Sequence, residues 1–181
     1  MKRDIEQSLI SWMNQPERLP LLLRGARQVG KTYVITRFGE ENFKRVININ
    51  FELQPRYINC FNDLDPNKIM NAIQAVSKTK IEDGETLLFL DEIQECPNAI
   101  KSLRYFKEKM PNLHIIGAGS LLEFTLNDSS FRMPVGRIQS IYLKPLSFKE
   151  YLYAAGCENL LEILANITID SELNTAVQQE L

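Results

Sequence analysis

Five short runs of apolar and β-branched residues are spread along the chain, each bounded by turn-forming or charged residues. Runs of this length are typical of β-strands buried on both faces. The predicted strands are residues 19–24, 45–51, 86–90, 113–117 and 137–143. The last of them alternates less cleanly than the others, because Ser140 interrupts its apolar residues.

Segments with helical periodicity separate the predicted strands. Helices are predicted to start near residues 5, 31, 65, 97 and 147, and the one from residue 31 is predicted to end near Gly39. The sequence Asp65–Pro66 supplies an N-cap followed by proline at the first helical position, and Ser147 with Glu150 forms a capping box. Helix after strand, repeated, predicts an α/β fold with a parallel sheet covered by helices on both faces.

Composition agrees with an ordinary globular protein. The 181 residues suffice for one sizeable core and are marginal for two domains. Hydrophobic residues make up 44% and charged residues 24%. The net charge of -2 gives a nucleic-acid partner no support, although a local basic patch stays open.

The ends of the chain and its cysteines indicate a compartment. Cys60, Cys96 and Cys157 are scattered without metal-ligand spacing, which favours reduced thiols in the cytoplasm. Residues 1–7 are too charged for a secretory signal, and the apolar runs are too short to span a bilayer. We therefore expect a cytoplasmic protein with no membrane partner.

The first strand leads directly into a phosphate-binding motif. Residues 25–32 read GARQVGKT, which fits the P-loop pattern G-x-x-x-x-G-K-[ST] with a strand before it and a helix after it. Backbone N–H groups of such a loop cradle phosphate, the lysine reaches the β- and γ-phosphates, and the hydroxyl binds Mg²⁺. The predicted ATP ligands are Gly25, Ala26, Arg27, Gln28, Val29, Gly30, Lys31, Thr32 and Tyr33.

A second acidic motif follows the third strand. The sequence LLFLDE at residues 87–92 matches the Walker B pattern, with Asp91 placed to hold Mg²⁺ together with Thr32. Glu92 can deprotonate the attacking water, and the alternative is that both acids merely cap the next helix. An adjacent glutamate is typical of the ATP-using branch of P-loop NTPases, whose strand order is 5-1-4-3-2.

Two further residues complete the predicted catalytic set of Lys31, Glu92, Ser120 and Arg137. Ser120 follows the fourth strand and is a candidate sensor of the γ-phosphate, although a helix N-cap explains it as well. Arg137 is favoured over Arg132 as a source of transition-state charge, in cis or across a subunit interface. A plain surface arginine is the alternative for each.

These motifs together resemble a known family. The segments RGARQVGKT, FLDEIQ, GSLL and LKPLSFKEY, in this order, are similar to bacterial and archaeal AAA-superfamily ATPases in which a P-loop domain precedes a C-terminal domain of unknown function. The resemblance covers about residues 21–151 and implies a longer full-length protein. We expect an ATPase core at residues 1–155 and, at 156–181, a helical segment that starts a lid or C-terminal region.

Three functions are consistent with these motifs. The first is Mg-dependent ATP hydrolysis that moves an attached domain, with a homo-oligomer possible and nucleic acid as one possible substrate. The second is a nucleotide-gated binding module with little hydrolysis. The third, a small-molecule kinase, is disfavoured because Glu92 suits the activation of water and no acceptor pocket is visible.

Overall fold

The computed structural model describes residues 3–120 and 136–165. These residues fall into two compact units. The larger unit is Ile5–Lys144, and the smaller contains Arg3, Asp4 and the chain from Pro145 onward. The expected division into a core at residues 1–155 and a helical segment from residue 156 stays a prediction.

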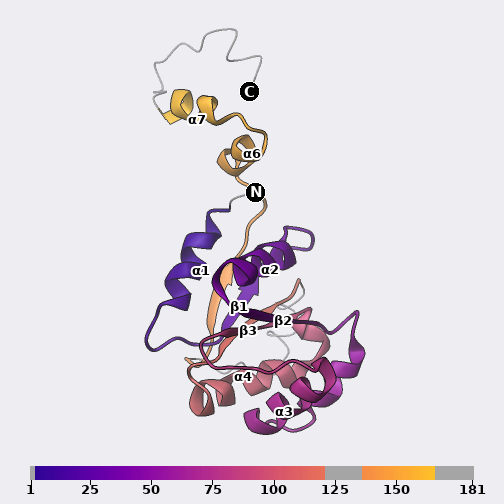
Figure 1. The fold of residues 1–181 in the computed structure, drawn as a ribbon. Coiled ribbons are helices and arrows are strands. Elements are labelled where there is room, and N and C mark those ends of the chain that lie inside the picture. Colours follow the sequence, from indigo (N-terminus) through magenta and orange to yellow (C-terminus); the bar gives the residue numbers. More distant parts are fainter. Residues whose placement is uncertain (1–2, 121–135, 166–181) are drawn as a thin grey trace. The chain divides into compact units, whose positions relative to one another are not determined.

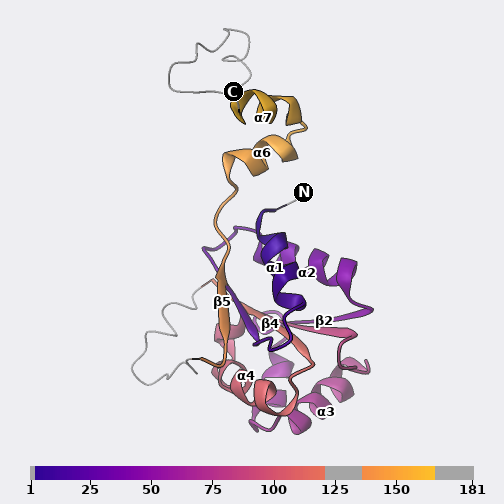
Figure 2. The same ribbon diagram turned by 90° about the vertical axis from the view of Figure 1, so that its left-hand side faces the viewer.

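The larger unit is built on a five-stranded parallel sheet (Figure 1). The strands are β1 (Leu21–Arg24), β2 (Arg45–Asn50), β3 (Thr86–Asp91), β4 (His114–Ala118) and β5 (Gln139–Tyr142). Their spatial order is β2-β3-β4-β1-β5, with β5 at one edge (Figure 2). This is the predicted order 5-1-4-3-2 read from the other side, and the prediction is confirmed.

Helices cover both faces of this sheet, as the alternating pattern predicted. On one face lie α1 (Ile5–Met13) and α2 (Lys31–Asn42); on the other lie α3 (Pro66–Ser77), α4 (Pro97–Lys109) and the 3-10 turn η1 (Pro55–Phe61) (Figure 1). A second 3-10 turn, η2 (Ile93–Glu95), follows β3.

Strand β3 explains why two separate cores form. All six of its residues are buried. Leu88 and Leu90 pack with α3 and α4, whereas Leu87 and Phe89 pack with α1 and α2, because successive side chains point to opposite faces. Each such side chain contributes about 2 kcal/mol through burial, so the uninterrupted apolar run anchors the sheet.

Gly39 corrects the predicted end of the helix after the P-loop. The sequence suggested that α2 stops near this glycine, yet the helix continues to Asn42. A Cβ atom at residue 39 would lie 2.7 Å from Cγ2 of Val46 and 3.0 Å from Cδ2 of Leu87. The glycine therefore permits close packing of α2 on the sheet and does not terminate the helix.

The smaller unit contains α6 (Phe148–Ala154) and α7 (Glu158–Ala165). The predicted capping box is present, because the Ser147 hydroxyl accepts from the Glu150 amide and the Glu150 carboxylate accepts from the Ser147 amide. Arg3 Nε and the Asp4 amide also donate to Glu150, at 2.9 and 2.8 Å. The rest of the helical segment expected at 156–181, residues 166–181, lies outside the described residues.

Candidate nucleotide-binding site

The P-loop connects β1 to α2 at the carboxyl edge of the sheet. Helix α2 begins at Lys31, and its N-cap Gly30 has φ 91° and ψ 26°, in the left-handed region that favours glycine. The first N–H groups of a helix have no acceptor within it, and the helix dipole adds positive potential there. The loop thus ends in a site suited to an anion.

Gly25 allows the loop to turn away from β1. Its φ is +150°, and a Cβ atom there would lie 2.3 Å from the carbonyl oxygen of Leu143. The neighbouring Leu143 amide donates to Arg24 O at 2.8 Å, which holds the two backbones together. Only glycine fits between them, so the first glycine of the motif is required by the close approach of the chain that follows β5.

Lys31 is buried beneath the loop, with 6% of its surface exposed. Its Nζ donates to Gly25 O at 3.1 Å and to Ala26 O at 2.8 Å. Burial lowers the pKa of Lys31, while the charges of Glu92 and Asp91 raise it in part. The structure therefore brings the predicted phosphate-binding lysine together with both acids of the second motif.

Thr32 and Asp91, the two residues predicted to hold Mg²⁺, are in direct contact. Thr32 Oγ1 donates to Asp91 Oδ2 at 2.9 Å. Neighbouring oxygen ligands of an octahedral Mg²⁺ ion lie about 3 Å apart, so this pair fits two adjacent positions. Burial raises the pKa of Asp91, and the hydrogen bond from Thr32 opposes that rise.

A hard-cation site of this kind needs few protein ligands. The described residues hold no group of three or more His, Cys, Asp or Glu side chains that could bind a metal. Mg²⁺ in nucleotide sites uses one or two protein oxygens together with phosphate oxygens and water. The Thr32–Asp91 pair is therefore consistent with magnesium that arrives with its nucleotide.

Glu92 lies directly after β3 in an unusual backbone conformation. Its φ of 47° and ψ of 46° are left-handed, which costs a non-glycine residue about 1 kcal/mol. Its amide is hydrogen-bonded to Asp91 Oδ1 at 3.1 Å, and its carboxylate Oε2 accepts from Gln94 Nε2 at 2.7 Å. Glu92 is the N-cap residue of the 3-10 turn η2, but its side chain makes no cap hydrogen bond there, so the alternative that this acid merely caps a helix gains no support.

The two weaker candidates lie at opposite edges of the sheet. Ser120 is half-buried two residues after β4, the strand between β1 and β3, so it lies at the same edge as the P-loop. Its sensor role stays a prediction. Arg137 precedes β5 and pairs with Glu108 near the end of α4. Arg132 lies outside the described residues.

The position of Arg137 corrects its predicted role within one subunit. Leu21 is in register with Gln139, so Arg137 is level with the chain ahead of β1. From that level, residue 19, to Gly25 an extended chain covers about 20 Å, at about 3.3 Å per residue. An arginine side chain cannot cover that distance, and the cis alternative is therefore wrong. A role across a subunit interface stays a prediction.

Two residues of the site were not predicted from the sequence. Asn50, the last residue of β2, donates from Nδ2 to Asp91 Oδ2 at 3.2 Å, and its Oδ1 accepts from the Leu53 amide at 2.9 Å. Gln94 contacts Glu92 as described above. A polar residue at the carboxyl end of a predicted strand could have signalled Asn50, whereas nothing in the spacing singled out Gln94.

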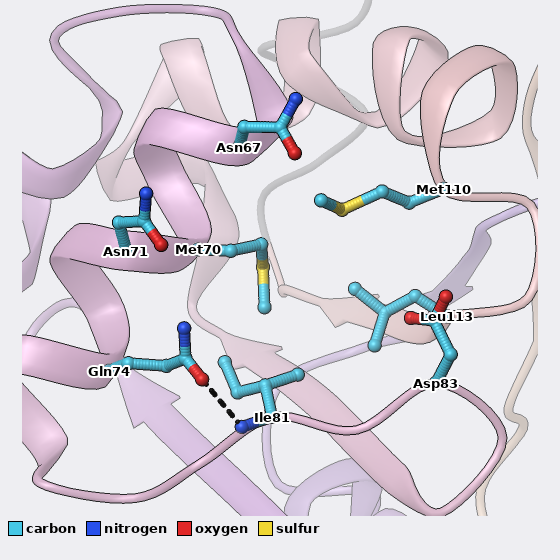
Figure 3. Close-up of a pocket in the computed structure, with 8 residues that line it drawn as sticks. All are labelled: Asn67, Met70, Asn71, Gln74, Ile81, Asp83, Met110 and Leu113. Atoms are coloured by element: carbon cyan, nitrogen blue, oxygen red, sulfur yellow. Dashed lines mark hydrogen bonds between the residues drawn. The ribbon is translucent and has the colours of Figure 1, made fainter.

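A separate hollow of about 140 Å³ opens between α3 and the chain that leads into β3 and β4. Asn67, Asn71 and Gln74 line one side of it, and Met70, Met110 and Leu113 form its apolar part (Figure 3). The side-chain oxygen Oε1 of Gln74 accepts from the Ile81 amide at 2.9 Å. None of the predicted nucleotide ligands lines this hollow.

Comparison with protein families identifies the family of this chain. A family model described as an AAA domain matches residues 17–152, most of the chain and all of the site described above. The chain belongs to the AAA domain family. The attached C-terminal domain of unknown function stays an expectation. No curated protein matches the chain in sequence.

Solved structures place the AAA domain among known folds. The Walker-type ATPase paby2304 of Pyrococcus abyssi has a TM-score of 0.56 and 20% identity, and the match covers 92% of this chain and 60% of that one. PCH-2 of C. elegans also matches, with a TM-score of 0.48 and 15% identity, over 97% of this chain and 51% of that one. The DNA-bound ORC1 protein of Aeropyrum pernix matches with a TM-score of 0.49 and 14% identity, over 85% of this chain and 47% of that one. The first likeness shows a shared P-loop ATPase fold, and this chain spans about half the length of these proteins.

Proposed function

We propose that this AAA domain binds Mg-ATP at the P-loop and hydrolyses it. The observation that carries the proposal is the 2.9 Å contact between Thr32 and Asp91, which joins the two motifs beside the buried Lys31. A phosphate cradle, a cation-binding pair and an adjacent carboxylate are the parts that phosphoryl transfer to water needs.

Each residue has a defined part in the proposed reaction. Loop amides and Lys31 would hold the β- and γ-phosphates, and Thr32 with Asp91 would hold Mg²⁺, which supplies charge neutralisation when bound. Glu92 would accept a proton from the attacking water while the oxygen of that water forms a bond to the γ-phosphorus. The bond from that phosphorus to the bridging oxygen breaks, and ADP and phosphate leave.

The purpose of hydrolysis in this proposal is motion of an attached domain. The AAA domain covers 60% of the Walker-type ATPase from Pyrococcus abyssi, so that relative carries further chain beside its ATPase fold. We propose that residues 1–155 act as the core and that the segment from 156 starts a lid or C-terminal region. A homo-oligomer and a nucleic-acid substrate belong to the same proposal.

A cytoplasmic setting completes this proposal. In the parts of the chain that the structure describes, no helix combines the length and apolarity that a membrane crossing requires. Cys60 and Cys96 are buried free thiols, consistent with a reducing compartment.

A nucleotide-gated module with slow turnover is the second candidate. It is favoured by the position of Arg137, which pairs with Glu108 at the edge of the sheet opposite the P-loop. Within one chain, Arg137 is therefore remote from the P-loop. In this candidate, ATP binding changes the conformation and hydrolysis only resets it.

Phosphate release and ATP binding, measured on the same preparations, test both candidates. We expect Glu92→Gln to bind ATP normally and to lose at least about a hundredfold in turnover, the range for removal of a general base. Lys31→Ala should lose ATP affinity in a direct titration. Rapid turnover in Glu92→Gln would refute the assigned base, and unchanged affinity in Lys31→Ala would refute the cradle.

A further inference from the structure

The contact between Gln94 and Glu92 is one that no part of the proposed reaction yet uses. Gln94 Nε2 donates to Glu92 Oε2 at 2.7 Å, the length of a charge-assisted hydrogen bond. The orientation of the amide follows from chemistry, since its oxygen turned toward a carboxylate would be repelled. The bond engages one carboxylate oxygen of Glu92 and leaves the other for the reaction.

The backbone that carries Gln94 is held firmly. Residues 93–95 form the turn η2, closed by hydrogen bonds from the Glu95 amide to Glu92 O and from the Cys96 amide to Ile93 O, both at 3.0 Å. Ile93 is fully buried, and its Cδ1 lies 2.8 Å from the position of a Cβ on Gly117. The backbone of Gln94 is therefore held in place by its buried neighbour Ile93 and by the hydrogen bonds of the turn.

The oxygen of the Gln94 side-chain amide indicates that stability alone does not explain a glutamine at this position. Gln94 Oε1 is shielded from solvent and has no hydrogen-bond partner among the described residues. An unsatisfied buried acceptor costs about 1–3 kcal/mol, so an apolar residue of the same shape would fold at least as well. A polar side chain kept at such a cost beside a catalytic carboxylate is typical of functional positions.

We propose that Gln94 is a positioning residue for ATP hydrolysis: its amide fixes the carboxylate of Glu92 in the orientation that receives the proton of the attacking water. This inference rests on the proposed function. General bases are commonly oriented by a third group in this way. Gln94 acts through Glu92, so it affects turnover and not the binding of nucleotide.

Gln94→Met tests the proposal, because methionine keeps the length of the side chain and removes the donor. We expect kcat to fall by about tenfold or more, as misplacement of a catalytic group commonly does, while the affinity for ATP stays within about twofold of wild type. Gln94→Glu keeps the shape and places a like charge against Glu92, so we expect it to be at least as slow. Gln74→Met, which removes a glutamine far from the P-loop, serves as the matched control with wild-type turnover.

Non-additivity separates positioning from a general structural effect. In the Glu92→Gln background, Gln94→Met should cause no further loss of kcat, because its only target has been removed. Wild-type turnover in Gln94→Met, or a full further loss in the double variant, would overturn the inference. A wild-type chain without phosphate release, or rapid turnover in Glu92→Gln, would overturn the proposed function and this inference together.

Discussion

At the residue scale, the site depends on a few atoms that meet across long stretches of sequence. Asp91 Oδ2 accepts from Thr32 at 2.9 Å and from Asn50 at 3.2 Å, and these three residues end or follow different strands. The two donors offset part of the desolvation of this buried carboxylate.

Gly25 offers a test of the cradle at this scale. In Gly25→Ala the new Cβ would lie 2.3 Å from the carbonyl oxygen of Leu143, so the loop or the chain after β5 must shift. We expect a loss of about 2 kcal/mol or more in the free energy of unfolding, together with loss of ATP binding. Urea unfolding and ATP titration measure the two effects.

Gly84→Ala is the matched control for this prediction. Its φ is +76°, which alanine also tolerates poorly, but no atom lies within 4 Å of the added Cβ. We expect a loss of about 1 kcal/mol and normal ATP binding. Equal effects of the two substitutions would show that backbone conformation alone, and not the close approach of Leu143, requires glycine at residue 25.

At the element scale, β4 contains a buried ionisable group on its first residue. His114 is 7% exposed, and its ring packs edge-on against Trp12 and Phe43, with centroids 5.8 and 4.7 Å away. Burial and then the nearby Arg18 lower its pKa from 6.5 to about 4, partly opposed by a hydrogen bond with the Met13 backbone. This histidine in an apolar strand is a core residue.

This histidine predicts a pH dependence of stability. Between pH 6.5 and about 4 the unfolded chain binds a proton at His114 that the folded chain does not, so stability falls as the pH falls through this range. We expect the wild type to lose about 3 kcal/mol relative to His114→Phe, at 1.36 kcal/mol per pKa unit. Urea unfolding of both proteins from pH 7 to pH 4 measures the difference, and parallel curves would contradict the lowered pKa.

At the scale of the whole molecule, the parallel sheet decides which groups share an edge. Asn50 and Asp91 are the last residues of their strands, and the P-loop and Ser120 follow the carboxyl ends of theirs. Arg137 precedes a strand, so it lies at the other edge. In open α/β sheets ligands bind at the carboxyl edge, which explains why the acids and the cradle meet there.

Arg137 provides the corresponding test. We expect Arg137→Ala to match the wild type in phosphate release when both are monomeric, because the side chain is remote from its own P-loop and its exposed pair with Glu108 contributes at most about 1 kcal/mol to stability. Light scattering establishes the oligomeric state. Glu108→Ala breaks the same ion pair and is the control.

Loss of turnover in monomeric Arg137→Ala, with Glu108→Ala normal, would contradict this placement. The role across a subunit interface has its own test in a mixture of Arg137→Ala and Glu92→Gln. Turnover that exceeds the sum of the separate variants would show that an intact arginine of one subunit serves the intact glutamate of another.

The sequence by itself determined the features that depend on local chemistry. The loop that leads from a strand into a helix at residue 31, the buried strand before Asp91 and the capping box at Ser147 are each encoded within a few residues. The structure contains each of these elements as predicted. The strand order followed from the second motif and was also confirmed. The binding roles of these residues stay predictions that the experiments above address.

Only the tertiary structure decided which distant residues meet. It joined Asn50 to Asp91 and Gln94 to Glu92, kept Gly39 inside a helix, and separated Arg137 from the P-loop. The reason is physical: side-chain contacts between elements depend on register, backbone turns and close packing, which residues far apart in sequence establish together. The local motifs therefore located the cradle, and the packing of the sheet selected the partners of its two acids.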